Sequence, residues 1–358
     1  MKKGDQSILS FVLTINTEFW IALKFSFCCF LYIVPGTPAE AQRSGFSQFF
    51  SSPLNLNPGY TGQITGDWRI TGNIRSQGYY YSDPVNSTNL SIDKPINILE
   101  SQFGVGLILG NDFSQNHTAP SQMIYGSLGK AIQISSRSGL GVGFQLGYVN
   151  KRLSYKRLAF PEQYDRNSGN FNHELPLSEN FENERSGYLD INAGIVWNYT
   201  APRYVISSGM AIFHLNQPKE SFLNQEYQLK SRLNWHITTK YFINQKFYIV
   251  PQAYLTHQTK ASLVLAGSNL GYRINSDKTK LKSLSIGAYY RSNLDLNVKT
   301  MVFESGFNFN NWLTTLSFDF NANRNSTGNL YSQAIEFSII YERPSTILRK
   351  TTLPWIRY

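Results

Sequence analysis

The chain has 358 residues, of which 15% are aromatic and only 16% are charged, and its formal net charge is +10. A soluble domain carries roughly 25% charged residues, and a bundle of membrane helices needs repeated apolar runs of about 20 residues. No such run follows residue 34, and the mean hydropathy is −0.29. The many aromatic residues exclude a disordered chain, and the basic residues form no stripe or motif for nucleic acid. The composition fits a sheet that is apolar on one face and polar on the other.

The first residues, 1–41, have the layout of a secretory signal peptide. An apolar run, Phe25–Val34, ends at a Pro-Gly-Thr-Pro break, and an Ala-Glu-Ala cleavage site follows at 39–41. We predict a mature chain that starts at Gln42 and is exported through the general secretion pathway. An uncleaved helical anchor is the alternative. The mature chain would contain no cysteine, because the two cysteines lie in the removed part: Cys28 and Cys29.

Between residues 62 and 341 the dominant pattern is strict alternation of apolar and polar residues, the period of a strand. A soluble β-sandwich would show the same alternation. The segments are about 10–13 residues long, against roughly 5–6 for ordinary strands, and their polar positions hold Gly, Ser, Asn and Gln rather than Lys and Glu. Only a closed barrel removes sheet edges within lipid. We therefore predict an all-β fold, an antiparallel transmembrane barrel of the outer membrane of a Gram-negative cell.

Thirteen segments are clear, and bacterial outer-membrane barrels have even strand numbers, short periplasmic turns and long outer loops. Placing the long connections 151–186, 214–229 and 322–330 outside requires one more strand before residue 151. The tyrosine-rich segment Gly78–Asp83 is the best candidate, which makes fourteen strands. The division is then a signal peptide (1–41), an N-terminal periplasmic segment (42–61), the barrel (62–341) and a C-terminal periplasmic tail (342–358), with no second domain.

Six short motifs, in order along the chain, resemble the PorP/SprF family of type IX secretion system membrane proteins. The family phrases are "Q-F-S-Q-Y … N-P-A-Y-A-G", "R-x-Q-W", "F-x-D-Q-Y-D", "H-L-N-x-P", "Y-R" and "S-Y-D-F-N … E-I-S". Gly78 stands where the family has Trp, and the tail lacks the family's Cys-Pro pair. The corresponding residues here are Phe46–Phe50, Pro53–Gly62, Arg75–Gln77, Phe160–Asp165, His214–Pro218, Tyr290-Arg291, Ser317–Asn321 and Glu336–Ser338.

The resemblance implies a non-enzymatic barrel of the type IX secretion and gliding machinery. Its partners would be outer-membrane lipid, a large secreted adhesin as cargo, and periplasmic ring or motor components, with no nucleic acid. No cofactor, metal or catalytic residue is expected, and none of the five histidines is spaced as a metal pair. A general porin for small solutes and a lipid-modifying enzyme of the outer membrane are the alternatives. The candidate partner-contact or family-motif residues are Asn57, Pro58, Gly59, Tyr60, Phe160, Gln163, Tyr164, His214, Asn216, Pro218, Asp319 and Glu336.

Several of these residues have a predicted structural role. Asn57–Tyr60 forms a tight turn that packs beneath or within the barrel at its periplasmic end, either as a seal or as a docking element. His214 fixes a turn at the rim by hydrogen bonding to backbone, or contacts a partner. The outer loops 151–186 and 214–229 either capture a partner through aromatic and Arg side chains or are solvated. Lumen ion pairs are predicted from the polar-face residues Asp190, Glu304, Asp319 and Glu336 with Lys130, Lys240, Arg273 and Arg291.

Overall fold

The computed structural model describes residues 45–78, 84–98, 101–113, 120–153, 161–165, 168–172, 175, 184–222, 225–259, 261–274, 280–293, 299–321 and 333–345. The chain divides into two units, residues 1–40 and 41–358. The described residues all belong to the second unit. Among them, no helix is long and apolar enough to cross a membrane.

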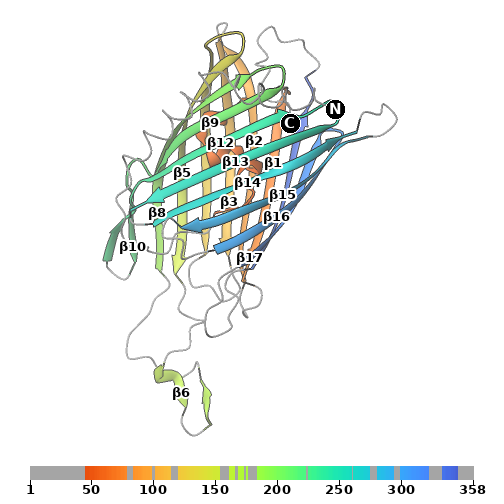
Figure 1. Cartoon of the computed structure of the whole chain (residues 1–358). Coiled ribbons are helices and arrows are strands. Elements are labelled where there is room, and N and C mark those ends of the chain that lie inside the picture. Colours follow the sequence, from red (N-terminus) through yellow and green to blue (C-terminus); the bar gives the residue numbers. More distant parts are fainter. Residues whose placement is uncertain are drawn as a thin grey trace. The chain divides into compact units, whose positions relative to one another are not determined.

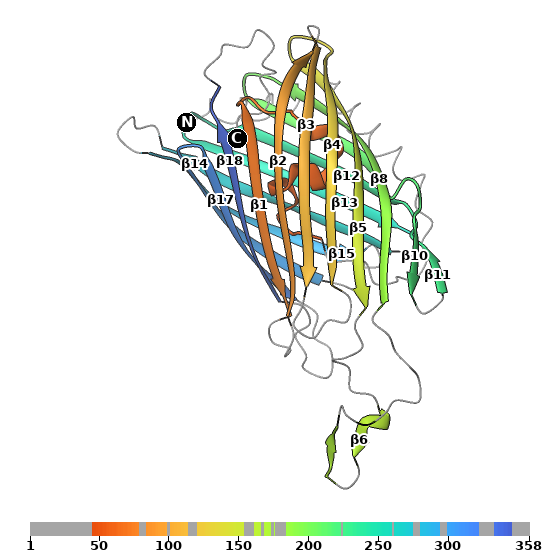
Figure 2. The same ribbon diagram turned by 180° about the vertical axis from the view of Figure 1, so that it is seen from behind.

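Fourteen antiparallel strands close into a barrel, in which β1 pairs with both β2 and β18 (Figures 1 and 2). The strands are β1 (Trp68–Gln77), β2 (Val85–Ile98), β3 (Ser101–Phe113), β4 (Ser121–Gln133), β5 (Ser138–Leu153), β8 (Glu184–Thr200), β9 (Tyr204–Phe213), β12 (Arg232–Phe242), β13 (Phe247–Gln258), β14 (Ala261–Arg273), β15 (Leu281–Asn293), β16 (Lys299–Phe309), β17 (Trp312–Asn321) and β18 (Ala334–Arg343). Two short hairpins lie outside the barrel sheet: β6 (Tyr164–Asp165) with β7 (Asn170–Phe171), and β10 (Lys219–Phe222) with β11 (Gln225–Gln228).

The fold class and the number of strands are confirmed, but the strand that the sequence did not reveal is β2. Its centre reads Ser-Ile-Asp-Lys-Pro, which resembles a loop because charges and proline are rare within strands. Asp93 nevertheless faces the lumen, where it pairs with Arg69. Of the predicted strand at 78–83, Gly78 lies outside any strand and the other residues lie outside the described part.

The two faces of the strands follow the predicted alternation. In β5 the lumen side holds Gly141, Gly143 and Gln145, whereas Phe144 and Leu146 are exposed on the outer face. An outward apolar band of this kind is what lipid requires. Lys130 departs from the expectation of a lumen cation: it is exposed and stacks on its outward neighbour Phe103, 5.2 Å from the ring centre.

The two ends of the barrel differ. Six connections are short in sequence, and the strand ends that they join lie at the end of the barrel where β1 begins and β18 ends: 99–100, 134–137, 201–203, 243–246, 274–280 and 310–311. Aromatic side chains gather there: Tyr341 packs against Trp68 and Trp312, with ring centroids 5.2 and 4.4 Å away. The opposite end carries the connections 154–183 and 214–231, with both small hairpins (Figure 1). By the usual orientation of such barrels, the short-turn end faces the periplasm and the long-loop end faces outward.

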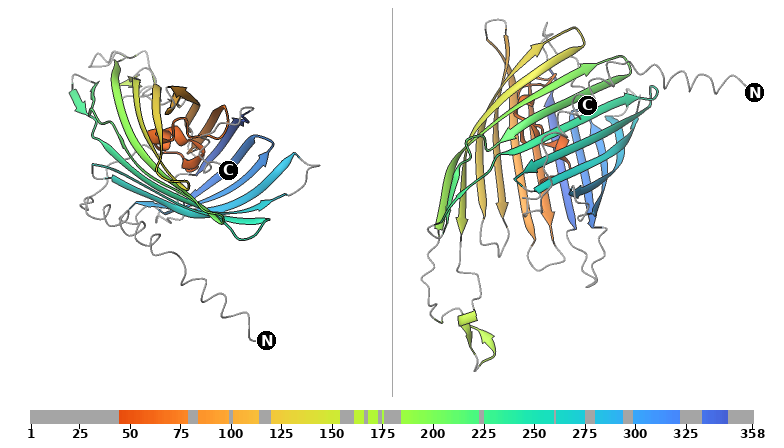
Figure 3. Two further views of the ribbon diagram at one scale, coloured as in Figure 1. Left: turned by 90° about the horizontal axis from the view of Figure 1, so that it is seen from above. Right: turned by 60° about the vertical axis from the view of Figure 1, so that its left-hand side comes forward.

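The segment before β1 lies inside the barrel. It forms three short helices, η1 (Phe49–Ser51), α3 (Pro53–Leu56) and η2 (Pro58–Tyr60), which the strands enclose (Figure 3). Nearly all of residues 47–63 are buried. We refer to residues 47–63 as the plug. It includes most of the stretch that the sequence assigns to a periplasmic N-terminal segment.

Candidate functional site

The plug folds as a compact element because its sequence sets the turns locally. Proline at the first position of both α3 and η2 suits a helix start, where no backbone N–H is needed. The Asn57 side chain then caps η2 by accepting a hydrogen bond from the Gly59 N–H at 2.8 Å. The Thr61 hydroxyl closes the turn by donating to the Pro58 carbonyl at 2.7 Å. The Asn-Pro-Gly-Tyr motif is therefore a self-capped turn.

This turn docks on the wall formed by β8, β9 and β12. The Asn57 amide donates to the carbonyls of Ile195 and Met210, each at 3.0 Å, and lies 3.3 Å from His236 Nε2. Tyr60 stacks on the His236 ring with centroids 5.3 Å apart, and its hydroxyl hydrogen-bonds to Ser207 at 2.7 Å. His236 is fully buried. Asn57 thus joins the plug to two strands as well as capping its own helix.

Glycines on the lumen face of the strands allow the plug backbone to approach closely. A Cβ on Gly143 would lie 2.0 Å from the Pro58 carbonyl oxygen, and one on Gly104 would lie 2.1 Å from that of Thr61. Any other residue would clash with backbone that cannot move aside. The glycines therefore form a surface without side chains on which the plug packs. Gly129, Gly141 and Gly194 belong to the same surface.

The start of the plug is held by a buried ionic cluster, which consists of Arg75, Arg291, Asp319 and Glu336. Arg75 pairs with Asp319 at 2.7 Å and with Glu336 at 3.1 Å, and Arg291 pairs with Asp319 at 3.3 Å. These residues come from β1, β15, β17 and β18, each near the outer end of its strand. Buried charges need such partners because desolvation is costly.

Ser47 and Gln48 insert into this cluster. Their backbone N–H groups donate to the Glu336 carboxylate at 2.7 and 3.1 Å, and the Ser47 hydroxyl donates to Asp319 at 2.7 Å. Arg75 and Arg291 in turn donate to the Ser47 oxygen. The Gln48 amide bonds Ser317 and Ser338 on the adjacent strands. The cluster is therefore completed by the plug.

A second ion pair holds the exit of the plug towards β1. Gly62 has a positive φ of 72°, which favours glycine, and its N–H donates to Asp93 at 2.8 Å. The same carboxylate accepts two hydrogen bonds from Arg69, both 2.9 Å long. The plug is thus fixed at both ends by buried arginine–carboxylate groups.

The structure brings most of the sequence motifs together. Asp319 and Glu336, predicted as lumen charges, meet the Ser47-Gln48 motif in one cluster. Asn57–Tyr60 lies inside the lumen, where Asn57 and Tyr60 bond β8 and β9. Arg75 was missed as their main counter-ion, although it stands in the Arg-x-Gln motif. Ser47 and Glu336 are 289 positions apart, so no local pattern could pair them.

The His214 ring has a buried carboxylate as a partner: its Nδ1 atom lies 2.9 Å from Asp190, which also accepts from Tyr125 at 2.7 Å. The predicted contacts of His214 with backbone or with a partner protein stay predictions. Asn216 contacts the backbone, because its side-chain amide donates to the Leu189 carbonyl and accepts from the Ile191 N–H. Pro218 is buried, and its carbonyl accepts from the Leu229 N–H at 2.9 Å.

The remaining candidates belong in sequence to the long loop 154–183. Gln163 ends the short helix η3 (Pro161–Gln163), just before the β6–β7 hairpin; it is buried, and its carbonyl accepts from the Asn172 N–H at 2.8 Å. Tyr164 is exposed and packs edge-on against Phe171, with centroids 5.3 Å apart. Phe160 lies outside the described residues.

A continuous chain of hydrogen bonds links the loop 214–231 to the plug. The His214 N–H donates to Asn192, the Asn192 amide donates to Gln145, and the Gln145 amide donates to the Leu54 carbonyl, at 3.0, 3.3 and 2.8 Å. An apolar cluster runs beside it, with Leu229 of the loop and Leu54 of the plug among its members; the others are Ile108, Met123, Tyr125, Val149 and Tyr188. The loop and the plug therefore share both a polar and an apolar connection.

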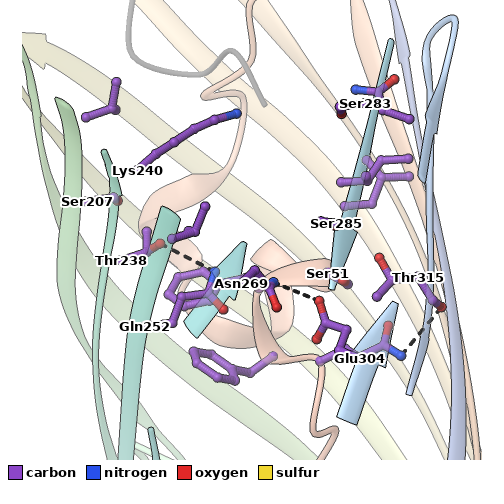
Figure 4. Close-up of a pocket in the computed structure, with 18 of the residues that line it drawn as sticks. Ser51, Ser207, Thr238, Lys240, Gln252, Asn269, Ser283, Ser285, Glu304 and Thr315 are labelled. Carbon is purple, nitrogen blue, oxygen red and sulfur yellow. Dashed lines mark hydrogen bonds between the residues drawn. The ribbon is translucent and has the colours of Figure 1, made fainter. Parts of the chain in front are cut away.

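The opposite wall of the lumen, β12 to β17, is less completely filled. A cavity of about 150 Å³ lies there between the plug and the wall (Figure 4). Glu304, which accepts from Asn269 at 3.0 Å, and Lys240 lie on opposite sides of it. Phe49, Phe50 and Tyr60 of the plug form part of its lining.

Arrangements for catalysis or metal binding are scarce among the described residues. No group of three His, Cys, Asp or Glu side chains is placed to hold a metal ion there. His257 lies 2.7 Å from the Ser262 hydroxyl, but this pair is on the outer face, and no described carboxylate bonds the histidine. A nucleophilic serine needs both a base and a group that orients it. The pair therefore gives no support to an enzyme.

The closed antiparallel sheet, the outward apolar band and the asymmetric loops define an outer-membrane β-barrel, here with a lumen that its own N-terminal segment occupies. A comparison with protein-family models matches residues 39–341 to the family described as type IX secretion system membrane protein PorP/SprF. The chain belongs to this family.

Other comparisons add little. Solved structures with a similar barrel include the Ralstonia pickettii toluene transporter TbuX, with 10% identity over 82% of this chain and 93% of that one, at a TM-score of 0.46. A Pseudomonas aeruginosa FadL homologue has 9% identity over 80% and 92%, with a TM-score of 0.48. Such distant likenesses carry no argument about function. The search of curated proteins found no match.

Proposed function

We propose that this barrel is a non-enzymatic component of the type IX secretion and gliding machinery that supports export or surface attachment of a cognate secreted adhesin. Membership of the PorP/SprF family supports the general role. The observation that carries the proposal is the plug: four family motifs contribute side chains to the cluster that holds Ser47 and Gln48. These buried charges hold a segment that fills the lumen instead of lining an open channel.

The plug also weighs against the general porin. A diffusion pore needs a water path with a charged constriction. Residues 47–63 lie across the lumen and bond strands from β1 to β18 around it. The family role fits this arrangement better than passive uptake of small solutes does.

In the mechanism we propose, the outer loops capture the secreted partner and the short-turn end meets periplasmic ring or motor components. Tyr227 on the β10–β11 hairpin is 72% exposed, and Tyr164 and Phe171 form an exposed aromatic pair. Exposed aromatic residues are common interface anchors. Force on the loop 214–231 would reach the plug through Asn192 and Gln145. Delivery would use the signal peptide at 1–41, the general secretion pathway and contact with outer-membrane lipid.

Site-specific photo-crosslinking in native membranes tests this proposal. A crosslinking residue at Tyr227 samples the outer end, and one at Lys246, exposed in a short turn, samples the other end. We expect the first to capture a large secreted surface protein and the second to capture periplasmic components. If both probes captured only the barrel itself, and deletion of the gene impaired solute uptake while secretion continued, the porin would replace this reading.

A further inference from the structure

The periplasmic mouth of the lumen contains two basic side chains that no acidic residue of the described part of the chain neutralises. Lys240 and Arg273 both face inward, at the ends of β12 and β14. Their charged groups lie 5.7 and 5.1 Å from the centre of the same Phe242 ring, and so within 11 Å of each other. Among the described residues neither forms an ion pair. Lys240 also lies 4.3 Å from the ring of Tyr248.

Lys240 and Tyr248 line the cavity described above. Figure 4 shows Lys240 and Ser283 in the upper part of the view, above Glu304. Ser283 lies near the periplasmic start of β15. The side-chain oxygens of Asn308, which pairs with Ser283, and of Asn269, which lies further in, are buried without a hydrogen-bond partner. Buried amide oxygens without partners call for water or a ligand that donates hydrogen bonds.

We propose that the mouth formed by Lys240, Arg273, Phe242 and Tyr248 binds an acidic, extended peptide segment from the periplasmic side. The two cations would pair with the carboxylates of the peptide, and the aromatic rings would pack against its apolar atoms. The amide oxygens of the cavity would accept hydrogen bonds from its backbone N–H groups. A volume of about 150 Å³ admits a side chain or a short stretch of chain and excludes a folded domain. Because the cations face the lumen, lipid headgroups do not reach them as they reach outward-facing residues.

The distribution of charge around the mouth also favours the approach of an acidic peptide from the periplasmic side. Among the described residues that line the cavity, Glu304 is the only acid; it accepts from Asn269 and lies on the side opposite Lys240. The short turns carry more basic than acidic residues, which attracts an acidic partner over a distance of about a Debye length, ~8 Å at physiological salt. In chain order these turn residues are Glu100, Arg137, Arg203, Lys246, Asp277, Lys278 and Lys280.

The inference deepens the proposed function, because it gives the chemistry of the periplasmic partner, and it can be tested separately. The folded barrel in lipid nanodiscs would be titrated with a fluorescein-labelled peptide of alternating Gly and Asp, and binding read by fluorescence anisotropy. A peptide with Asn in place of Asp is the neutral probe. We expect binding of the acidic peptide only, and at least a tenfold loss of affinity in both Lys240→Gln and Arg273→Gln.

Lys282→Gln is the matched control, because Lys282 lies at the same end on β15 but is exposed on the outer face. An equal loss in this control would show a diffuse charge effect and overturn the site. If inorganic phosphate displaced the peptide completely and bound with the same affinity, the site would be a simple anion site, and the proposal would be overturned. Unfolding on heating, seen as a gel shift, checks that each variant is folded. Secretion is not measured here, so a failed titration rejects the peptide site and leaves the secretion role to its own test.

Discussion

The two walls of the lumen are built in different ways. The wall from β3 to β9 presents glycine and a few hydrogen-bonding side chains, and the plug backbone lies directly against it. The wall from β12 to β17 presents longer polar side chains, and a cavity separates part of it from the plug. The first wall is shaped for a permanent contact, and the second has space for water or a ligand. The contrast indicates that the plug is a structural part of the barrel and that the space for a bound molecule lies along the second wall.

The ionic cluster should be the most sensitive feature, because it ties the plug to the strands that close the barrel. Arg75→Met leaves Asp319 and Glu336 buried with too little positive charge, and breaking a buried pair in this way costs about 3–5 kcal/mol. Urea unfolding in lipid vesicles should show this loss. Arg152→Met, at an exposed position, is the control and should change stability little. Equal stability of the two variants would mean that the cluster does not hold the plug.

A side chain introduced at one of the lumen-facing glycines that contact the plug should displace the plug from the first wall. Gly143→Leu places atoms where the Pro58 carbonyl lies, and overpacking of this kind costs about 1–3 kcal/mol or more. A cysteine at position 48 should then become reactive towards a thiol reagent. Gly126→Leu is the matched control, since a Cβ there meets only one atom, at 3.9 Å. Reaction in the control as well would contradict a specific fit.

Breaking the hydrogen bonds that connect the loop 214–231 to the plug should cause a smaller loss of stability. Gln145→Leu leaves the Leu54 carbonyl and the Asn192 amide without their partner, and such losses cost about 1–3 kcal/mol. Hydrogen exchange of the backbone amides of the plug should rise. Gln122→Leu, exposed on the neighbouring strand, should leave exchange unchanged. Unaltered exchange in Gln145→Leu would show that the loop and the plug are not coupled.

The smallest effect is expected at the outer mouth. Lys151→Gln removes the ion pair with Glu220 of the β10–β11 hairpin, where both side chains retain some exposure. A partly exposed pair contributes about 0–1 kcal/mol. Global unfolding should be nearly unchanged, while proteolysis within the hairpin accelerates. A stability loss as large as that of Arg75→Met would reverse the ranking of the two ends.

The fold was predictable because alternation is local, whereas the site was predictable only in its parts. Neighbouring residues such as the exposed Phe144 and the buried Gln145 show in the sequence which face of the sheet each one occupies. Nothing near Ser47 in the sequence indicates that its N–H donates to Glu336. Similarly, β2 was missed because its Asp93 is satisfied by Arg69 on another strand. The family resemblance named Asp319, Glu336 and the Arg-x-Gln motif without showing that they meet. Long-range pairing of buried charges is what the sequence alone did not reveal.

The central claim is that residues 47–63 lie in the lumen of the mature barrel, and a disulfide tests it most directly. The hydroxyls of Thr61 and Ser127 are 2.6 Å apart on short side chains, so Thr61→Cys with Ser127→Cys should form a bond in native outer membranes. After denaturation, PEG-maleimide should label no thiol until a reductant is added. The control pair, Thr61→Cys with the outward-facing Ser262→Cys, should be labelled at once. Immediate labelling of both pairs would contradict the plug.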